Sequence, residues 1–312
     1  MFWDKKGLIY NGDKRLGEDF SAYARFPVVD VVNETVWRIY FSSTSDSMVS
    51  YPFYLDVEAG NPFNILNVSN KPLLMPGDRG TFDDSGITSS CIVDVDGAKY
   101  LYYVGWNKRV SVPCSVNIGL AISEDGGKTF KKPFKGAIID RNRYDAVFTT
   151  IPCVIRDGTD FRMWYVSCLR WQEVNGKTIP VNVIKHAESK DGINWDINDD
   201  VCIASLYPEE ALGRPWVIKE DGLYKMWFSA YGTYSRSDRD NRRYMITYAE
   251  SEDGIRWERK PELFDLDVSS EGWDSEMLQY CSVFKDKVKK YMFYSGNGFG
   301  KTGFGLAVCD GK

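Results

Sequence analysis

The run Phe161-Arg162-Met163-Trp164-Tyr165-Val166 indicates the architecture of the protein, because versions of it recur along the whole chain. Each version is a short run rich in aromatic and apolar residues, a composition that is typical of β-strands. The aromatic residues at the matching position, spaced by 62, 62, 63 and 66 residues, are Tyr40, Tyr102, Trp164, Trp227 and Phe293. Self-similarity at a nearly fixed period indicates a repeat architecture.

Further strands surround each of these aromatic runs. Short apolar runs precede them at residues 27–29, 91–93, 152–155, 215–218 and 281–284. In three repeats an Asp-Gly pair joins the two runs, which is a hairpin signal. A third run follows at residues 118–122, 184–188, 246–250 and 304–308. Three of these continue through Ser-x-Asp-Gly to an aromatic residue, at 123–130, 189–195 and 251–257, a pattern that resembles the Asp box of sialidases and related propellers.

The repeat therefore predicts an all-β chain that forms one five-bladed β-propeller of four-stranded antiparallel blades, a single domain over residues 1–312. The last repeat stops after its third strand, at residues 307–309. Residues 2–6, Phe-Trp-Asp-Lys-Lys, are similar to the segments that follow two of the Asp boxes, such as Trp257-Glu-Arg-Lys. We therefore expect the N-terminal strand to close the last blade, which removes an open sheet edge.

Composition limits the possible partners. The net charge of -5 contains no long basic run, which argues against nucleic acid, and no apolar run reaches the length of a membrane span. The seven cysteines form no CxxC pair, and no secretory signal is visible, so a cytoplasmic protein is expected. His186 is the only histidine and lies in the strand column of Leu120, Tyr248 and Leu306, which indicates a packed side chain. We predict no metal site and no cofactor, and the oligomeric state stays open.

Carboxylates gather in the segments that precede the innermost strands. Glu210 and Glu276 each lie five residues before an aligned strand residue, and Asp84 lies six before Ser90. Equivalent positions of a radial repeat converge on its axis. We therefore predict that these three carboxylates form the catalytic set at one mouth of the propeller, that is, at one end of its central channel. Asp145 and Asp274 lie in equivalent segments and are predicted to bind substrate. The alternative for each acid is a loop cap or a solvated charge.

Cations and aromatic residues are expected at the same mouth. Arg25 and Arg214 stand beside the predicted acids and would bind an anionic group such as a carboxylate or phosphate. Trp106 and Trp171 follow the second strands, and Tyr280 precedes an inner strand, so all three are predicted to contact substrate. Aromatic walls around carboxylates suit a sugar ring, although both tryptophans fit a packing role as well. Sugar or oligosaccharide is therefore the expected partner.

The whole chain resembles the five-bladed glycosidase superfamily, which includes arabinanases, β-xylosidases, invertases, levansucrases and mannoside phosphorylases. It is most similar to glycosidase-like proteins of bacterial surface-polysaccharide gene clusters. The segments that carry the likeness are residues 82–86, 103–107, 163–167, 213–215, 272–277 and 296–300. The resemblance implies hydrolysis, phosphorolysis or transfer of a glycosidic bond on a bacterial glycan, with paired carboxylates as acid and as base or nucleophile.

One departure from that superfamily keeps other functions open. Its members usually place a catalytic Asp at the start of the first inner strand, where this chain reads Tyr23-Ala-Arg-Phe-Pro27. Arg25 in that context and the Asp boxes favour a sialidase-like enzyme acting on nonulosonic acids. The missing acid favours a catalytically silent propeller that binds a glycan or a nucleotide sugar.

Overall fold

The computed structural model describes residues 1–17, 19–20, 22–174, 176–234 and 242–310, and these residues form an all-β protein. Two sheets are built from consecutive strands. One contains β9 (Phe148–Asp157), β10 (Asp160–Val174), β11 (Lys177–Ser189) and β12 (Asp196–Ile203). The other contains β13 (Leu212–Glu220), β14 (Leu223–Tyr234), β15 (Arg242–Ser251) and β16 (Glu258–Arg259).

A sheet of seven strands combines two antiparallel groups. The first group is β2 (Ala22–Val31), β3 (Val36–Thr44), β4 (Ser50–Glu58) and β5 (Asn61–Val68). The second is β6 (Gly86–Val95), β7 (Ala98–Lys108) and β8 (Cys114–Ser123). A single parallel pair, Ser50 with Gly86, joins the groups, so they behave as neighbouring meanders rather than as one continuous sheet.

The last sheet joins the two ends of the chain. It contains β17 (Gln279–Asp286), β18 (Lys289–Ser295), β19 (Phe304–Asp310) and β1 (Asp4–Tyr10). β1 pairs antiparallel with β19, and Asp4 lies opposite Val308. The expected N-terminal closing strand is thereby confirmed. Short helical turns lie outside the sheets: η1 (Lys14–Leu16), η2 (Pro261–Leu263) and α1 (Asn297–Gly300).

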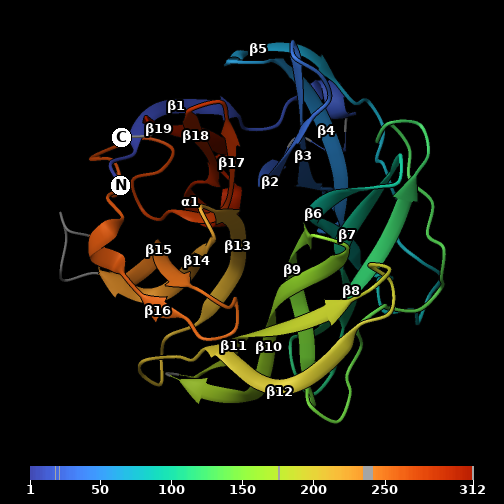
Figure 1. Cartoon of the computed structure of the whole chain (residues 1–312). Helices are drawn as coiled ribbons and strands as arrows, with labels where there is room; N and C mark the ends of the chain where they lie inside the picture. Colours follow the sequence, from blue (N-terminus) through green and yellow to red (C-terminus); the bar gives the residue numbers. More distant parts are fainter. Residues whose placement is uncertain (18, 21, 175, 235–241, 311–312) are drawn as a thin grey trace.

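The sheets are arranged around a common centre, with β2, β6, β9, β13 and β17 closest to it (Figure 1). Each of these first strands contacts the next one in the series, and β17 contacts β2, so the contacts return to their starting point. The aromatic residues that define the repeat lie between the sheets, and Tyr40, Tyr102, Trp164, Trp227 and Phe293 are each 0% exposed. The aromatic residues that recur in the sequence are therefore residues of the hydrophobic core.

The three Asp boxes are structural turns that connect neighbouring sheets. In the first, the Asp125 carboxylate accepts the backbone N–H groups of Lys128 and Thr129. The core aromatic of the preceding sheet then donates to a glycine carbonyl of the turn: Tyr40 to Gly127, Tyr102 to Gly192 and Trp164 to Gly254, at 3.0, 2.8 and 2.7 Å. Trp227 meets no Asp box and instead packs edge-on against Trp3 of the N-terminal segment, at 6.1 Å between ring centroids.

Candidate functional site

The first strands share a local irregularity that shapes the centre of the molecule. The strand register shifts near the middle of β2, β9, β13 and β17, where Phe26, Ile151, Arg214 and Tyr280 adopt positive φ. Such bulges redirect a side chain out of the pleat and concentrate at functional sites. Here Phe26 and Tyr280 stack with their ring centroids 3.9 Å apart. The bulges thus place a layer of side chains across the centre.

A cavity of about 310 Å³ lies against this layer, and we call it the central cavity. Its lining comes from β2, β6 to β11, β13, β15, β17 and α1, so the strand groups around the centre all contribute to it. Aromatic side chains make up much of the wall: Phe26, Trp106, Phe148, Trp171, Tyr244, Tyr280 and Phe299. Thr88, Asn182 and Arg25 supply polar groups. The volume and mixed lining are those of a small-molecule site.

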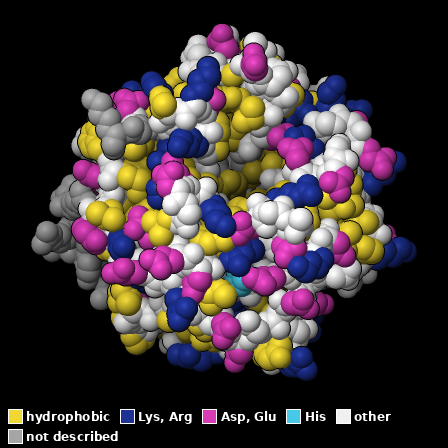
Figure 2. All heavy atoms as spheres, in the orientation of Figure 1, with side chains coloured by type: hydrophobic (Ala, Val, Ile, Leu, Met, Phe, Trp, Pro, Cys, Tyr) yellow, Lys and Arg dark blue, Asp and Glu magenta, His cyan; other side chains and the backbone are white. Residues whose placement is uncertain are grey.

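Two further hollows adjoin the central cavity. The side cavity, also about 310 Å³, shares Arg25, Trp106 and Cys114 with it and is lined in addition by Ser85 and Asn107. The apolar groove, about 530 Å³, shares Pro180, Tyr244 and Phe299 with it. Figure 2 shows one face of the molecule hollowed near its middle, with hydrophobic side chains visible inside and charged ones around it. A ligand could therefore extend from the central cavity in two directions.

Four of the residues predicted from the sequence meet at the central cavity, namely Arg25, Trp106, Trp171 and Tyr280. Arg214 lies nearby but is only 1% exposed. Its guanidinium donates to the carbonyl oxygens of Tyr280, Pro27 and Ser90 at 3.2, 2.8 and 3.3 Å. Burial lowers the pKa of Arg214 to about 10, so the side chain remains a cation that ties three first strands together.

The predicted acids are placed differently from the aromatic residues. Within the part of the chain that the structure describes, no Asp or Glu lines the central cavity or the side cavity. Glu210 is 3% exposed and pairs with both terminal nitrogens of Arg259 at 2.7 and 3.1 Å. Glu276 is exposed, and the side chain of Asn297 accepts its backbone N–H. The three predicted catalytic carboxylates therefore do not converge on the central cavity.

Asp84 is a predicted acid that contacts the wall of a hollow. Its carboxylate accepts hydrogen bonds from Ser85 and Asn107 at 2.7 and 2.9 Å, and both of these residues line the side cavity. Burial alone would raise the pKa of Asp84, but the hydrogen bonds from Ser85, Gly80 and Asn107 lower it overall. Asp84 is therefore a carboxylate at neutral pH, suited to act as a base or nucleophile and not as a general acid.

Asp145 and Asp274 belong to a repeated buried motif. Asp83, Asp145 and Asp274 each accept the hydroxyl of a tyrosine 20 residues further along, Tyr103, Tyr165 and Tyr294, at 3.0, 3.0 and 2.9 Å. Each also pairs with a lysine: Lys132, Lys185 and Lys5, at 2.6, 3.3 and 2.7 Å. All three carboxylates are at most 1% exposed. The constant Asp-to-Tyr spacing is a sequence signal that would have marked these acids as structural.

Another hollow, of about 420 Å³, lies beside the third Asp box and β16. Its charged lining is paired internally: Lys260 with Glu250 and Glu258, and Arg256 with Asp253. It is therefore a weaker candidate than the central cavity. In the described ranges no group of three His, Cys, Asp or Glu is placed to hold a metal ion, and no helix there is long and apolar enough to cross a membrane.

Comparison with solved structures defines the class of fold. A structure titled glycoside hydrolase has a TM-score of 0.74 and 16% identity, covering 99% of this chain and 91% of that one. A thermostable family-43 glycoside hydrolase gives 0.65 and 18%, over 93% and 92%. A structure described with the GH130 family of mannoside phosphorylases gives 0.66 and 14%, over 99% and 93%. The chain thus has the β-propeller fold of glycoside hydrolases.

Sequence comparison defines the family. The chain is 38% identical to the uncharacterized protein Rv1502 of Mycobacterium tuberculosis strain H37Rv, over 99% of this chain and 100% of that protein. The uncharacterized protein MT1551 of strain CDC 1551 matches to the same extent. The chain belongs to the family of these two proteins. It matches no protein-family model.

Proposed function

We propose that the chain is a single five-bladed β-propeller that binds a carbohydrate in its central cavity. The cycle of contacts from β2 through β6, β9, β13 and β17 back to β2 supports the five blades, with β2–β5 and β6–β8 as separate blades. The observation that carries the binding function is the cavity where these strands meet, walled by Trp106, Trp171 and Tyr280. Flat aromatic faces pack against the C–H groups of a sugar ring, and Thr88, Asn182 and Arg25 offer hydrogen bonds to its hydroxyls.

Titration of the protein with a panel of neutral and charged monosaccharides and disaccharides, followed by calorimetry, tests the proposal. We expect Trp106→Ala and Trp171→Ala each to weaken sugar binding about fivefold, because each removes a stacking surface worth on the order of 1 kcal/mol. Trp195→Ala is the control, since Trp195 lies in an Asp box and lines none of the three hollows. Equal affinities in all four proteins, with native circular dichroism, would refute binding in the central cavity.

Cleavage or transfer of a glycosidic bond is the second candidate, and Asp84 is the observation that favours it. Asp84 stands behind the Ser85 and Asn107 wall of the side cavity as an ionised carboxylate. A hydrolase also needs a carboxylic acid to protonate the leaving oxygen. Among the described residues no carboxylate lines either cavity, which makes binding without turnover the better-supported function.

Release of reducing sugar from oligosaccharides that bind the wild-type protein decides between the two candidates. A hydrolase should lose turnover in Asp84→Asn while retaining substrate affinity. Glu210→Gln reports on a different property, because it breaks the ion pair between the buried Glu210 and the partly buried Arg259 and should lower the melting temperature. Tight binding with no turnover in the wild-type protein would support the binding function and contradict the proposal that the protein is a hydrolase. Turnover that survives both substitutions would show that neither Asp84 nor Glu210 takes part in catalysis.

We further infer that the protein works in a reducing compartment, as the sequence led us to expect for the cytoplasm. The seven cysteines are all free thiols, and Cys91, Cys153 and Cys281 are buried at corresponding points of three first strands. Structural disulfides are common in oxidising compartments and rare in the cytosol.

A further inference from the structure

Arg25 lies where the central cavity and the side cavity meet, and it lines both. The bulged part of β2 holds it there, between Tyr23 and Phe26, whose φ values are +66° and +57°. The turn α1 packs closely against Arg25, because Gly300 leaves no room between them: a Cβ added to Gly300 would lie 2.5 Å from the Cβ of Arg25. Its position is therefore fixed by two elements.

The guanidinium of Arg25 is poorly satisfied by the protein. Its Nη2 donates to the hydroxyl of Thr44 at 3.3 Å, a long contact, and its buried Nε has no hydrogen-bond partner. The ring of Tyr23 lies 5.4 Å from the guanidinium carbon. Burial lowers the pKa of Arg25, which reflects the cost of removing this charge from water.

Other arginines of the chain show what is missing at Arg25. Arg38 pairs with Asp56 at 2.7 Å, and Arg259 pairs with Glu210 at the same distance. Arg25 forms no such ion pair within the described ranges, and the cavities that it lines contain Lys108 as a second cation and no described Asp or Glu. Arg25 is partly buried, and a cation that is partly removed from water and unpaired is costly unless a counter-charge is supplied.

Arg214 adds a further positive charge below the central cavity. Its guanidinium carbon lies 5.2 Å from the ring centroid of Phe26, which lines the cavity. Three carbonyl oxygens accept hydrogen bonds from its terminal nitrogens, but they carry only partial charges, and its buried Nε has no hydrogen-bond partner in the described chain. Because the surroundings exclude water, the field of such a cation is weakly screened. Both arginines therefore favour an anion at the junction of the two cavities.

We propose that the sugar bound in the central cavity carries an anionic group, a carboxylate or a phosphate, which pairs with Arg25 at the junction of the central and side cavities. The inference rests on the proposed sugar-binding function and names the class of its ligand. The anion would accept hydrogen bonds from the terminal nitrogens of Arg25, part of the planar fork with which arginine binds carboxylate and phosphate. The neutral part of the sugar would then lie against Trp106.

Calorimetric titrations with glucuronate, glucose 6-phosphate and glucose test the proposal on the full chain. We expect at least one of the two anionic sugars to bind tenfold or more tightly than glucose, and this preference to shrink as NaCl is raised. A preference for glucuronate identifies the group as a carboxylate, and a preference for glucose 6-phosphate identifies it as a phosphate. Equal affinities of the three sugars would overturn the proposal.

Arg25→Gln should weaken binding of the anionic sugar at least tenfold more than it weakens binding of glucose, and so remove the preference, because only the anionic sugar loses an ion pair. Arg25→Lys should retain part of it, because the charge remains without the planar fork. The matched control is Arg170→Gln, which removes the same charge from an exposed side chain beside Trp171 that lines none of the three hollows. An undiminished preference in Arg25→Gln would overturn the assignment. If that variant fails to fold, the comparison of the three sugars on the wild-type protein still decides.

The two proposals fail in distinguishable ways. If glucose and the anionic sugars bind equally, and Trp106→Ala weakens all of them, sugar binding stands and the role of Arg25 fails. If no sugar binds, or if the tryptophan substitutions have no effect, the proposed function fails and the inference fails with it.

Discussion

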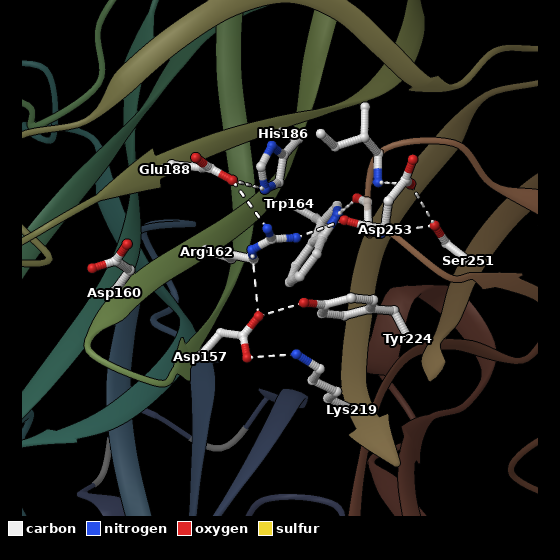
Figure 3. Close-up of polar contacts among 12 residues, drawn as sticks. Asp157, Asp160, Arg162, Trp164, His186, Glu188, Lys219, Tyr224, Ser251 and Asp253 are labelled. Carbon is white, nitrogen blue, oxygen red and sulfur yellow. Dashed lines mark hydrogen bonds and ion pairs between the residues drawn. The ribbon is translucent and has the colours of Figure 1, made fainter. Parts of the chain in front are cut away.

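His186 illustrates how burial sets the protonation of a single residue. It lies on β11 opposite Trp164 and is 3% exposed, and its Nε2 lies 3.9 Å from the carboxylate of Glu188, which is beyond hydrogen-bond distance (Figure 3). Arg162 lies close by and bridges Asp157 and Glu188. Burial, together with the positive charge of Arg162, lowers the pKa of His186 to about 4, although Asp253 opposes the shift. The imidazole is therefore neutral in the folded protein near neutral pH.

This pKa shift predicts a defined pH dependence of stability. Because the unfolded chain binds a proton near pH 6.5 and the folded one only near pH 4, stability should be lost as the pH falls through this window. The expected loss between pH 7 and pH 5 is on the order of 1 to 2 kcal/mol. Urea denaturation at both pH values measures it. His186→Leu should remove this part of the dependence, since leucine occupies the equivalent positions 120 and 306 opposite Tyr102 and Phe293. An unchanged dependence in the variant would contradict the assignment.

Single residues also show which structural features the sequence predicts and which it does not. The position of His186 in a packed strand column follows from periodicity and is confirmed. The contacts of Glu210 do not follow, because its partner Arg259 lies 49 residues away on another strand. The local sequence around a loop carboxylate is the same whether that carboxylate faces a ligand or the guanidinium of an arginine. The sequence therefore places aromatic residues at the cavity more reliably than charges, whose partners depend on tertiary contacts.

At the scale of elements, the turn formed by α1 controls the position of β2. Gly300 has φ of +82°, and any side chain there would press on Arg25 and on the carbonyl oxygen of Ala24. Gly298 in the same turn has φ of +61°, but an added Cβ would meet Lys301 and not β2. Substitutions at the two glycines therefore distinguish the effect of backbone strain, which both would cause, from displacement of the cavity wall, which only a side chain at Gly300 would cause.

We expect Gly300→Ala to weaken binding of the anionic sugar fivefold or more and to destabilise the protein by about 1–3 kcal/mol, because the contact with Arg25 must open. Gly298→Ala should cost comparable stability with little change in affinity. Calorimetric titration and urea denaturation of both variants give the comparison. If the two substitutions change affinity equally, α1 does not position Arg25.

Among the elements, the repeated strands and the Asp boxes could be predicted, and the bulges could not. A strand is encoded by local composition, and an Asp box by a fixed run of residues. A bulge depends on how a strand meets its neighbours at the crowded centre. The residues before Pro27, Pro152 and Pro215 are all bulged with positive φ, although a residue preceding proline ordinarily adopts extended backbone. Tertiary packing overrides that local preference.

At the scale of the molecule, the N-terminal segment holds the last sheet to its neighbour. Trp3 is 3% exposed and packs against Trp227 and Phe264, while the adjacent Phe2 is 70% exposed. Trp3→Ala should lower the free energy of unfolding by about 3–5 kcal/mol, because it leaves a large cavity between two sheets. Phe2→Ala is the matched control and should change it by less than about 0.5 kcal/mol. Chemical denaturation measures both, and similar effects would show that the segment is not needed for closure.

The last sheet also constrains how the protein is made. Asp4 lies opposite Val308, so β1 is synthesised long before β19, the strand with which it pairs. Until β19 is made, β1 has no edge to pair with. Nascent chains should therefore expose a strand-forming segment that includes Ile9 and Tyr10, which are buried in the folded protein, and such segments are bound by chaperones and aggregate when synthesis stalls.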